Sequence, residues 1–180
     1  MKRLLSVLFA VLFSCFCASG CAAPQSDASF RIVTSFYPMY IMTINITDGI
    51  DGVQVDNMAG QQTGCLHDYQ LQSSDMKNLE QADVFVINGA GMESFLDKVT
   101  EQLPDLTVVD SSQGLEVLDD NSHLWVSISN YIQQVGTIAD GLCAADPEHA
   151  EIYRANAQAY QEKLESLRDE MHQAIDPLPN

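Results

Sequence analysis

The sequence contains few positively charged side chains. Only 8 Lys and Arg residues stand against 25 Asp and Glu among 180 residues, which gives a formal net charge of −17. A nucleic-acid-binding domain needs a basic surface to neutralise phosphates, so this balance argues against DNA or RNA as a partner. A negative field attracts cations only mildly. The composition is therefore compatible with a cation ligand but does not establish one.

The motifs of several enzyme classes are missing or incomplete. The Gly-Ala-Gly string at residues 89–91 is followed by Ser94, where a dinucleotide-binding fingerprint needs a third glycine. The sequence has no Gly-x-Ser-x-Gly elbow and no His-Glu-x-x-His zinc motif. A metal-dependent hydrolase would need a general base beside a metal, and Asp68 next to His67 is the one candidate. We therefore expect a protein that is not an enzyme.

The amino terminus has an apolar stretch that is too short to span a bilayer. Residues 4–16 follow the basic pair at residues 2–3, whereas a membrane-spanning helix needs about 20 apolar residues. This pattern indicates a cleaved targeting signal. It ends in the Ala-Ser-Gly-Cys string at residues 18–21, which resembles a bacterial lipobox, although leucine is more usual at position 18. We expect a lipid on Cys21; the alternative is an ordinary secretory signal cut near residues 22–23.

Cysteine is also scarce in the part that folds. Cys15 and Cys17 lie in the leader and Cys21 is the expected lipid site, so Cys65 and Cys143 remain. Two cysteines can pair in an oxidising compartment. A disulfide needs Cα atoms about 4.4–6.8 Å apart, and the sequence does not give this distance. Whether Cys65 and Cys143 form a disulfide is therefore undecided.

Strand-like and helix-like segments alternate along the rest of the chain. Residues 84–87 form a continuous apolar run, typical of a parallel strand covered on both faces. The alternation indicates an α/β fold, and we predict a mainly parallel four-stranded sheet flanked by helices. The helix at residues 73–82 is expected to have its N-cap among residues 73–75. The expected strands are residues 31–35, 53–58, 84–87 and 106–110, and the expected helices are residues 38–46, 73–82, 93–102 and 128–144.

A last helix is predicted to be unusually long. Asp146 fits its N-cap and Pro147 its first position. Apolar side chains then recur in one stripe to Ile175, before Pro177 and Pro179 end the helix. A helix of about 45 Å exceeds what one domain of this size needs, so we expect it to connect to a second body. The alternative is an amphipathic helix packed on its own domain. The stripe consists of Tyr153, Ala157, Tyr160, Leu164, Leu167, Met171 and Ile175.

Two histidines lie in strings that could carry chemistry. His67 follows the carboxyl end of an expected strand, where open α/β sheets place ligand contacts, and His123 precedes Leu124 and Trp125. Imidazole is a frequent ligand of zinc and related metals. Each histidine taken alone could equally be a solvated loop residue.

The order of four strings makes the histidines more informative. TSFYP at residues 34–38, GCLHDY at 64–69, ADVFVINGAGME at 82–93 and SHLW at 122–125 follow one another. Together they resemble the zinc/manganese substrate-binding proteins of ABC transporters, a family of bilobed surface lipoproteins that includes proteins first described as adhesins. The resemblance covers the amino-terminal lobe and linker helix of that family.

The resemblance implies that His67 and His123 bind Zn²⁺ or Mn²⁺. The family's remaining ligands, usually a third histidine and a carboxylate, come from a second lobe that has no counterpart here. His149 and His172 are expected to be exposed residues of the last helix. Cys65 could reach a metal as thiolate, although the two histidines are the preferred pair.

The resemblance also implies how the chain is divided. It predicts a lipoprotein signal peptide at residues 1–20, a flexible tether at 21–29, a metal-binding lobe at 30–145, a linker helix at 146–176 and a truncated end at 177–180, with the carboxy-terminal lobe missing. Apolar surface on the linker helix would then be exposed, which favours aggregation.

The expected function is capture of Zn²⁺ or Mn²⁺ outside the cell membrane and delivery to an ABC transporter permease. The protein is expected to be a monomer held on the outer face of the membrane, or periplasmic, and impaired by the truncation. Because imidazole binds metal only when unprotonated, capture should weaken as the pH falls through about 6.5. The alternative is a surface adhesin or scaffolding lipoprotein in which the histidines have no role.

Overall fold

The computed structural model describes residues 29–60 and 66–178. The predictions about the leader, the tether and Cys21 therefore lie outside the described residues, and so does Cys65. The Sγ of Cys143 is buried and donates a hydrogen bond to the Ala150 carbonyl oxygen at 3.4 Å, and burial raises the pKa of this thiol. The pairing of Cys65 with Cys143 stays untested.

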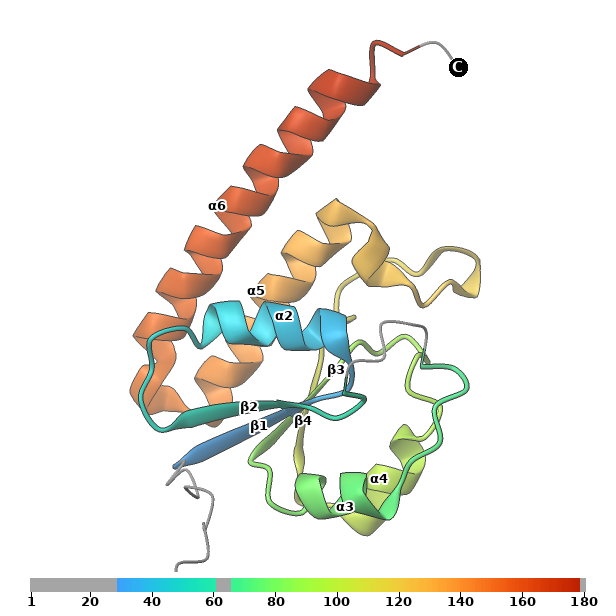
Figure 1. Ribbon diagram of the computed structural model, residues 1–180, viewed down its shortest axis with the longest axis vertical. Helices are drawn as coiled ribbons and strands as arrows, with labels where there is room; N and C mark the ends of the chain where they lie inside the picture. Colours follow the sequence, from blue (N-terminus) through green and yellow to red (C-terminus); the bar gives the residue numbers. More distant parts are fainter. Residues whose placement is uncertain (1–28, 61–65, 179–180) are drawn as a thin grey trace, which may run out of the picture.

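Four parallel strands form the centre of the domain (Figure 1). They are β1 (Phe30–Thr34), β2 (Val53–Asn57), β3 (Val84–Ile87) and β4 (Thr107–Asp110), in the spatial order β2-β1-β3-β4. Every pairing is parallel, so all carboxyl ends meet at one edge of the sheet. The predicted α/β fold with a mainly parallel four-stranded sheet is confirmed.

Helices cover both faces of the sheet, as Figure 1 shows. The helices α3 (Ser73–Leu79) and α4 (Leu96–Gln102) lie on one face. On the other face lie α2 (Tyr37–Ile46), α5 (Ile128–Ala145) and α6 (Ala150–Ile175), with α6 packed along α5. The strand β3 is buried along its whole length because both layers of helices cover it.

Two helices differ from the prediction in their caps or ends. The N-cap of α3 is Gln72, and Asp75 at the third helical position accepts a hydrogen bond from the Gln72 N–H at 2.7 Å. This reciprocal capping box places the start of α3 at Ser73, and α3 ends at Leu79 instead of residue 82. The helix α4 begins at Leu96 instead of residue 93, because the Glu93 side chain turns inward and binds the preceding loop.

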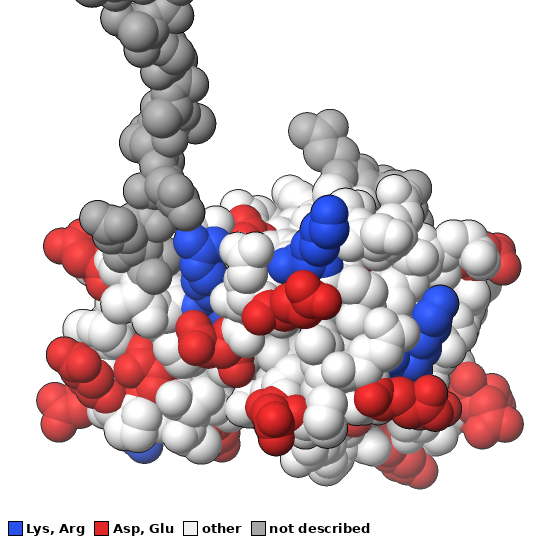
Figure 2. Space-filling model, turned by 90° about the horizontal axis from the view of Figure 1, so that it is seen from below, with Lys and Arg blue, Asp and Glu red and all other residues white. Residues whose placement is uncertain are grey.

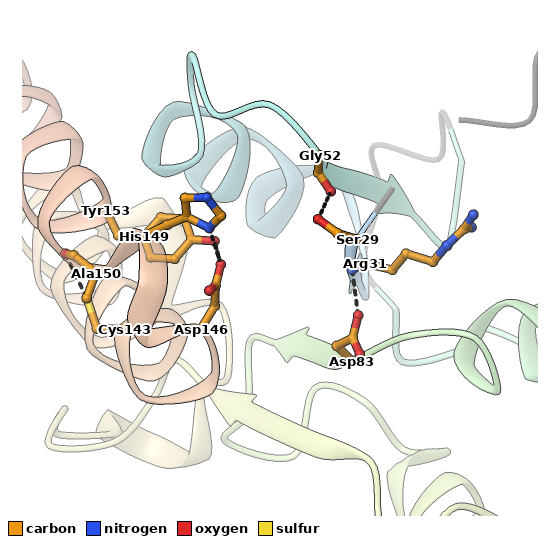
Figure 3. Close-up of polar contacts among 9 residues, drawn as sticks. All are labelled: Ser29, Arg31, Gly52, Asp83, Cys143, Asp146, His149, Ala150 and Tyr153. Carbon is orange, nitrogen blue, oxygen red and sulfur yellow. Dashed lines mark hydrogen bonds and ion pairs between the residues drawn. The ribbon is translucent and has the colours of Figure 1, made fainter. Parts of the chain in front are cut away.

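The α-helical part of the last helix begins later than predicted, although Asp146 is the N-cap of the turn that leads into it and Pro147 follows, as predicted. Residues Pro147–His149 form a short 3-10 turn, and α6 starts at Ala150. The Asp146 carboxylate accepts hydrogen bonds from the His149 Nδ1 and from the Tyr153 hydroxyl, both at 2.7 Å (Figure 3). The His149 side chain is 22% exposed, so the prediction of an exposed histidine was wrong here.

Removing the Tyr153 hydroxyl should destabilise the fold in a pH-dependent way. Burial alone raises the pKa of Asp146, but hydrogen bonds from Tyr153 and His149 outweigh it and hold that pKa below its ordinary value of 3.8. The stabilisation is therefore present above pH 3.8 and is lost as the pH falls through the lower folded pKa. We expect Tyr153→Phe to lower the free energy of unfolding at pH 7 by about 1.5–3 kcal/mol.

Urea unfolding at pH 7 and at pH 3 measures this effect. The difference in the free energy of unfolding between Tyr153→Phe and the unchanged protein should narrow at pH 3, because this pH lies below the ordinary pKa of 3.8, where the stabilisation begins to be lost. A gap of equal size at both pH values would contradict the role assigned to the Asp146 carboxylate.

The two halves of α6 have different surroundings. Tyr153 and Ala157 are buried against the domain, with exposed fractions of 0% and 3%, whereas Leu167, Met171 and Ile175 are 47%, 43% and 56% exposed. Figure 1 shows the carboxyl half of α6 extending beyond the body of the domain. The predicted stripe is thus continuous, but only its first half is covered by the domain itself.

The surface carries the acidic excess that the composition predicts. On the face drawn in Figure 2, Asp and Glu side chains are spread widely and basic side chains are few. Among residues 29–60 and 66–178, no helix is both long and apolar enough to cross a membrane.

Candidate metal centre

The structure brings the two predicted histidines together. His67 lies in the connection between β2 and α3, and His123 lies between two short 3-10 turns that follow β4. Their ring centroids are 5.5 Å apart and the ring planes meet at 64°. These connections leave the carboxyl edge of the sheet, so two residues 56 positions apart meet there because the strands are parallel.

Buried neighbours hold the loop that carries His67. The Leu66 side chain is 1% exposed, and its carbonyl oxygen accepts a hydrogen bond from the Tyr69 N–H at 2.9 Å. The Tyr69 ring packs on Phe95 at 5.6 Å between centroids. The Ser94 hydroxyl donates to the His67 carbonyl oxygen at 3.5 Å. His67 itself is exposed, so its ring is accessible to an ion from solution.

Aromatic packing holds His123. Its ring lies 5.1 Å from that of Trp125, and the Trp125 ring meets buried Phe36 edge-on at 4.9 Å. The next residue, Leu124, is 4% exposed. The His123 ring is therefore supported through Trp125 by the core, and its backbone is fixed by a buried side chain on the carboxyl side.

The side chain of Asn121 selects the tautomer of His123. Its Oδ1 lies 2.8 Å from the His123 Nδ1 and also accepts the His123 backbone N–H at 3.1 Å. An amide oxygen only accepts, so the Nδ1 carries the proton in this contact. The lone pair of the neutral ring is then on Nε2. This is the arrangement by which metal-binding histidines are usually oriented.

A cluster of buried polar side chains lies beneath the histidines. Asn88, at the carboxyl end of β3, donates to the Ser122 carbonyl oxygen at 2.9 Å and accepts from the Gln134 Nε2 at 3.1 Å. Gln134 on α5 also donates to the Ser111 hydroxyl at 2.9 Å. Asn88, Ser111 and Gln134 are each 0% exposed. The cluster ties β3, β4 and α5 to the segment that carries His123.

Glu93 fixes the loop that follows β3. Its Oε1 accepts from the Ser35 hydroxyl at 2.7 Å and the Asn88 N–H at 2.8 Å, and its Oε2 accepts from the Gly89 N–H at 3.0 Å. Burial raises the pKa of this carboxyl, and the three hydrogen bonds act in the opposite direction. The side chain is 5% exposed and serves as an internal cap for the loop.

Sequence reasoning did not assign roles to these supporting residues. Asn88 and Glu93 lie in one of the strings that carry the resemblance, but their contacts were not foreseen. A polar side chain directly after a fully apolar strand was the available signal for Asn88, since it must find partners at the carboxyl edge of the sheet. No local signal marks Gln134, which lies inside an amphipathic helix.

The described residues supply two candidate ligands at this place. No group of three or more His, Cys, Asp or Glu side chains among them is arranged to hold a metal ion. Asp68 is exposed, and His172 is a 63% exposed residue of α6, as predicted. A zinc site takes three or four protein ligands, so two imidazoles make up part of one.

The structure thus places two imidazoles together at the carboxyl edge of a parallel α/β sheet. The chain belongs to the family described as zinc-uptake complex component A, periplasmic, whose model matches residues 32–180. The resemblance inferred from the sequence is thereby confirmed.

Relatives in sequence are named for metal binding. The manganese-binding lipoprotein MntA of Halalkalibacterium halodurans is 31% identical over 182 residues, which cover 95% of this chain and 60% of that protein. The manganese ABC transporter substrate-binding lipoprotein PsaA of Streptococcus pneumoniae is 28% identical, over 99% of this chain and 63% of its own length. This chain thus spans about 60% of the length of these relatives.

Solved structures share the fold. The Zn(II)-bound ZnuA-like domain of Streptococcus pneumoniae AdcA superposes with a TM-score of 0.70 at 29% identity, over 77% of this chain and 52% of that one. The substrate-binding protein FpvC of Pseudomonas aeruginosa, in complex with Mn²⁺, gives 0.72 at 30% identity, over 80% and 55%.

Proposed function

We propose that this chain supplies His67 and His123 to a divalent-cation site of an extracytoplasmic ABC transporter substrate-binding protein. The cargo would be Zn²⁺ or Mn²⁺, delivered to a membrane permease without any bond being made or broken. The observation that supports this most is the 5.5 Å separation of the two imidazole rings at the carboxyl edge of the sheet. The names of the relatives, which describe zinc and manganese binding, support the choice of cation.

The ring separation fits a shared ion. Imidazole nitrogen binds zinc at about 2.0–2.1 Å, so two ligands at a tetrahedral angle have nitrogens roughly 3.3 Å apart. Rings with centroids 5.5 Å apart can present one nitrogen each at such a spacing. The contact of Asn121 with the His123 Nδ1 leaves the Nε2 to act as that nitrogen.

Two imidazoles alone would hold an ion weakly. We propose that the other coordination positions are filled by water in this chain, so its affinity by itself should be low and its transport function impaired. We also propose a lipid on Cys21 as the membrane anchor and a monomeric state. The relatives reported above are named for metal binding rather than attachment, so the adhesin alternative gains no support from them.

Nitrogen NMR of the histidine rings tests this function directly. On addition of Zn²⁺ to the chain, the ring nitrogens of His67 and His123 should shift together, with the same dependence on zinc concentration. His149, whose Nδ1 is bonded to Asp146, and His172, which is exposed on α6, act as internal controls and should not follow that curve. Shifts confined to His149 or His172 would contradict the assignment.

A further inference from the structure

We infer that Asn88 is a positioning residue of the candidate metal centre, because its buried amide holds Ser122 and so fixes His123 relative to His67. This inference deepens the proposed function and rests on it where metal affinity is concerned.

The Asn88 side chain is held from both ends. Its Nδ2 donates to the carbonyl oxygens of Gly89 and Ser122, both at 2.9 Å, and its Oδ1 accepts from the Gln134 Nε2 at 3.1 Å. Both amide protons and the oxygen therefore have partners. Since Asn88 is 0% exposed, water does not compete for these bonds. The amide has one orientation in which all three bonds form.

Ser122 connects Asn88 to both histidines. Its carbonyl oxygen is the acceptor for Asn88, its hydroxyl lies 3.4 Å from the His67 Nε2, and His123 is the next residue in the chain. The Ser122 residue is 3% exposed. A displacement of the Ser122 backbone would therefore move His123 directly and would also change the contact with His67.

The backbone of Asn88 is hydrogen-bonded on both sides. Its backbone N–H is held by the Glu93 carboxylate at 2.8 Å, and its backbone carbonyl accepts the Ser111 hydroxyl at 3.1 Å. Gln134, which donates a hydrogen bond to the Asn88 side chain, belongs to α5, the 18-residue helix packed on the sheet. The Asn88 side chain thus fixes the position of Ser122 relative to β3, β4 and α5.

Loss of the Asn88 amide should loosen the pair of imidazoles. Asn88→Ala would leave the Ser122 carbonyl oxygen and the Gln134 amide buried without these partners. Groups that orient metal ligands are typically worth about 10–100-fold in metal affinity. A residue with a merely structural role would lower stability without this loss of affinity in the folded state.

The test compares Asn88→Ala with Tyr153→Phe, a variant that loses a buried hydrogen bond at the base of α6. Both are first measured by urea unfolding, and Zn²⁺ affinity is then measured under conditions where each is folded, by competition with a chromophoric chelator. We expect affinity to fall about 10–100-fold in Asn88→Ala and to stay within about twofold of the unchanged chain in Tyr153→Phe. Unchanged affinity in folded Asn88→Ala, or an equal loss in both variants, would overturn the inference.

A metal-free readout separates this inference from the proposed function. The nuclear Overhauser effect between the His67 and His123 rings should be present in the unchanged chain and weakened in Asn88→Ala. If zinc does not bind through these histidines, the proposed function fails, but a weakened ring contact would still support positioning by Asn88. An unchanged ring contact would refute it.

A second variant covers the case in which Asn88→Ala does not fold. Asn88→Asp keeps an oxygen for Gln134 and removes the donor to the Ser122 carbonyl. The same weakening of the ring contact and of zinc affinity is expected, and its absence counts against the inference.

Discussion

Replacing His67 and His123 together by alanine should abolish specific binding of Zn²⁺ or Mn²⁺ by the chain. The described residues bring no third ligand to the two rings, so their removal leaves no pair of nitrogen donors at the carboxyl edge of the sheet. Each single substitution should lower affinity by at least about 100-fold, because groups that merely orient a ligand are already worth about 10–100-fold. Isothermal titration or competition with a chelator measures both effects.

The chain offers a matched control for this experiment. His172 is 63% exposed on α6, and its Nδ1 lies 3.3 Å from the Asp176 carboxylate one turn away. His172→Ala should leave affinity unchanged. Undiminished binding by the double variant, or an equal loss in His172→Ala, would show that the ion is held elsewhere.

Replacing Gly89 by alanine should destabilise the fold by about 3 kcal/mol or more. Gly89 has a φ of +78°, which strains any other residue, and a Cβ there would overlap the Asp110 Oδ1 and approach the Asp110 Cγ and the Ser112 hydroxyl at 2.5 Å. The Asp110 carboxylate cannot easily move away, because it accepts hydrogen bonds from the Ser112 N–H and hydroxyl at 2.8 and 2.7 Å. Backbone strain and overpacking each contribute about 1–3 kcal/mol.

Gly91→Ala separates these two contributions. Gly91 has a nearly identical φ of +77°, but nothing lies within 4 Å of an added Cβ. This variant should therefore lose only the backbone contribution of about 1–2 kcal/mol. Urea unfolding of both variants measures the difference. If both variants lose the same free energy of unfolding, the Asp110 side chain moves away from the added Cβ at no cost, which would contradict the prediction.

Much of the fold could be predicted because its signals are local. The run at β3 is apolar throughout, and a strand covered on both faces needs that composition. The helices α2 and α5 begin and end within one residue of prediction. The meeting of His67 with His123 could be foreseen only through the resemblance, because nothing in either string alone brings two loops together.

The remaining features depend on contacts between distant residues. Asn88 and Ser122 are 34 positions apart, so their hydrogen bond has no signature in either string. The start of α6 was misplaced because the first turn after Asp146 is a 3-10 turn, which an Asp-Pro string does not distinguish from the first turn of an α-helix. The division of α6 into covered and uncovered halves follows from where its antiparallel neighbour α5 begins, at Ile128, which periodicity does not encode.

The common direction of the strands gives the domain a polarity. The chain enters β1 at Phe30 on the amino edge, whereas the imidazoles lie at the carboxyl edge, about 16 Å away along a strand of this length. A lipid on Cys21, as proposed above, would attach the domain through its amino edge, so the anchor and the imidazoles would lie at opposite ends of the strands.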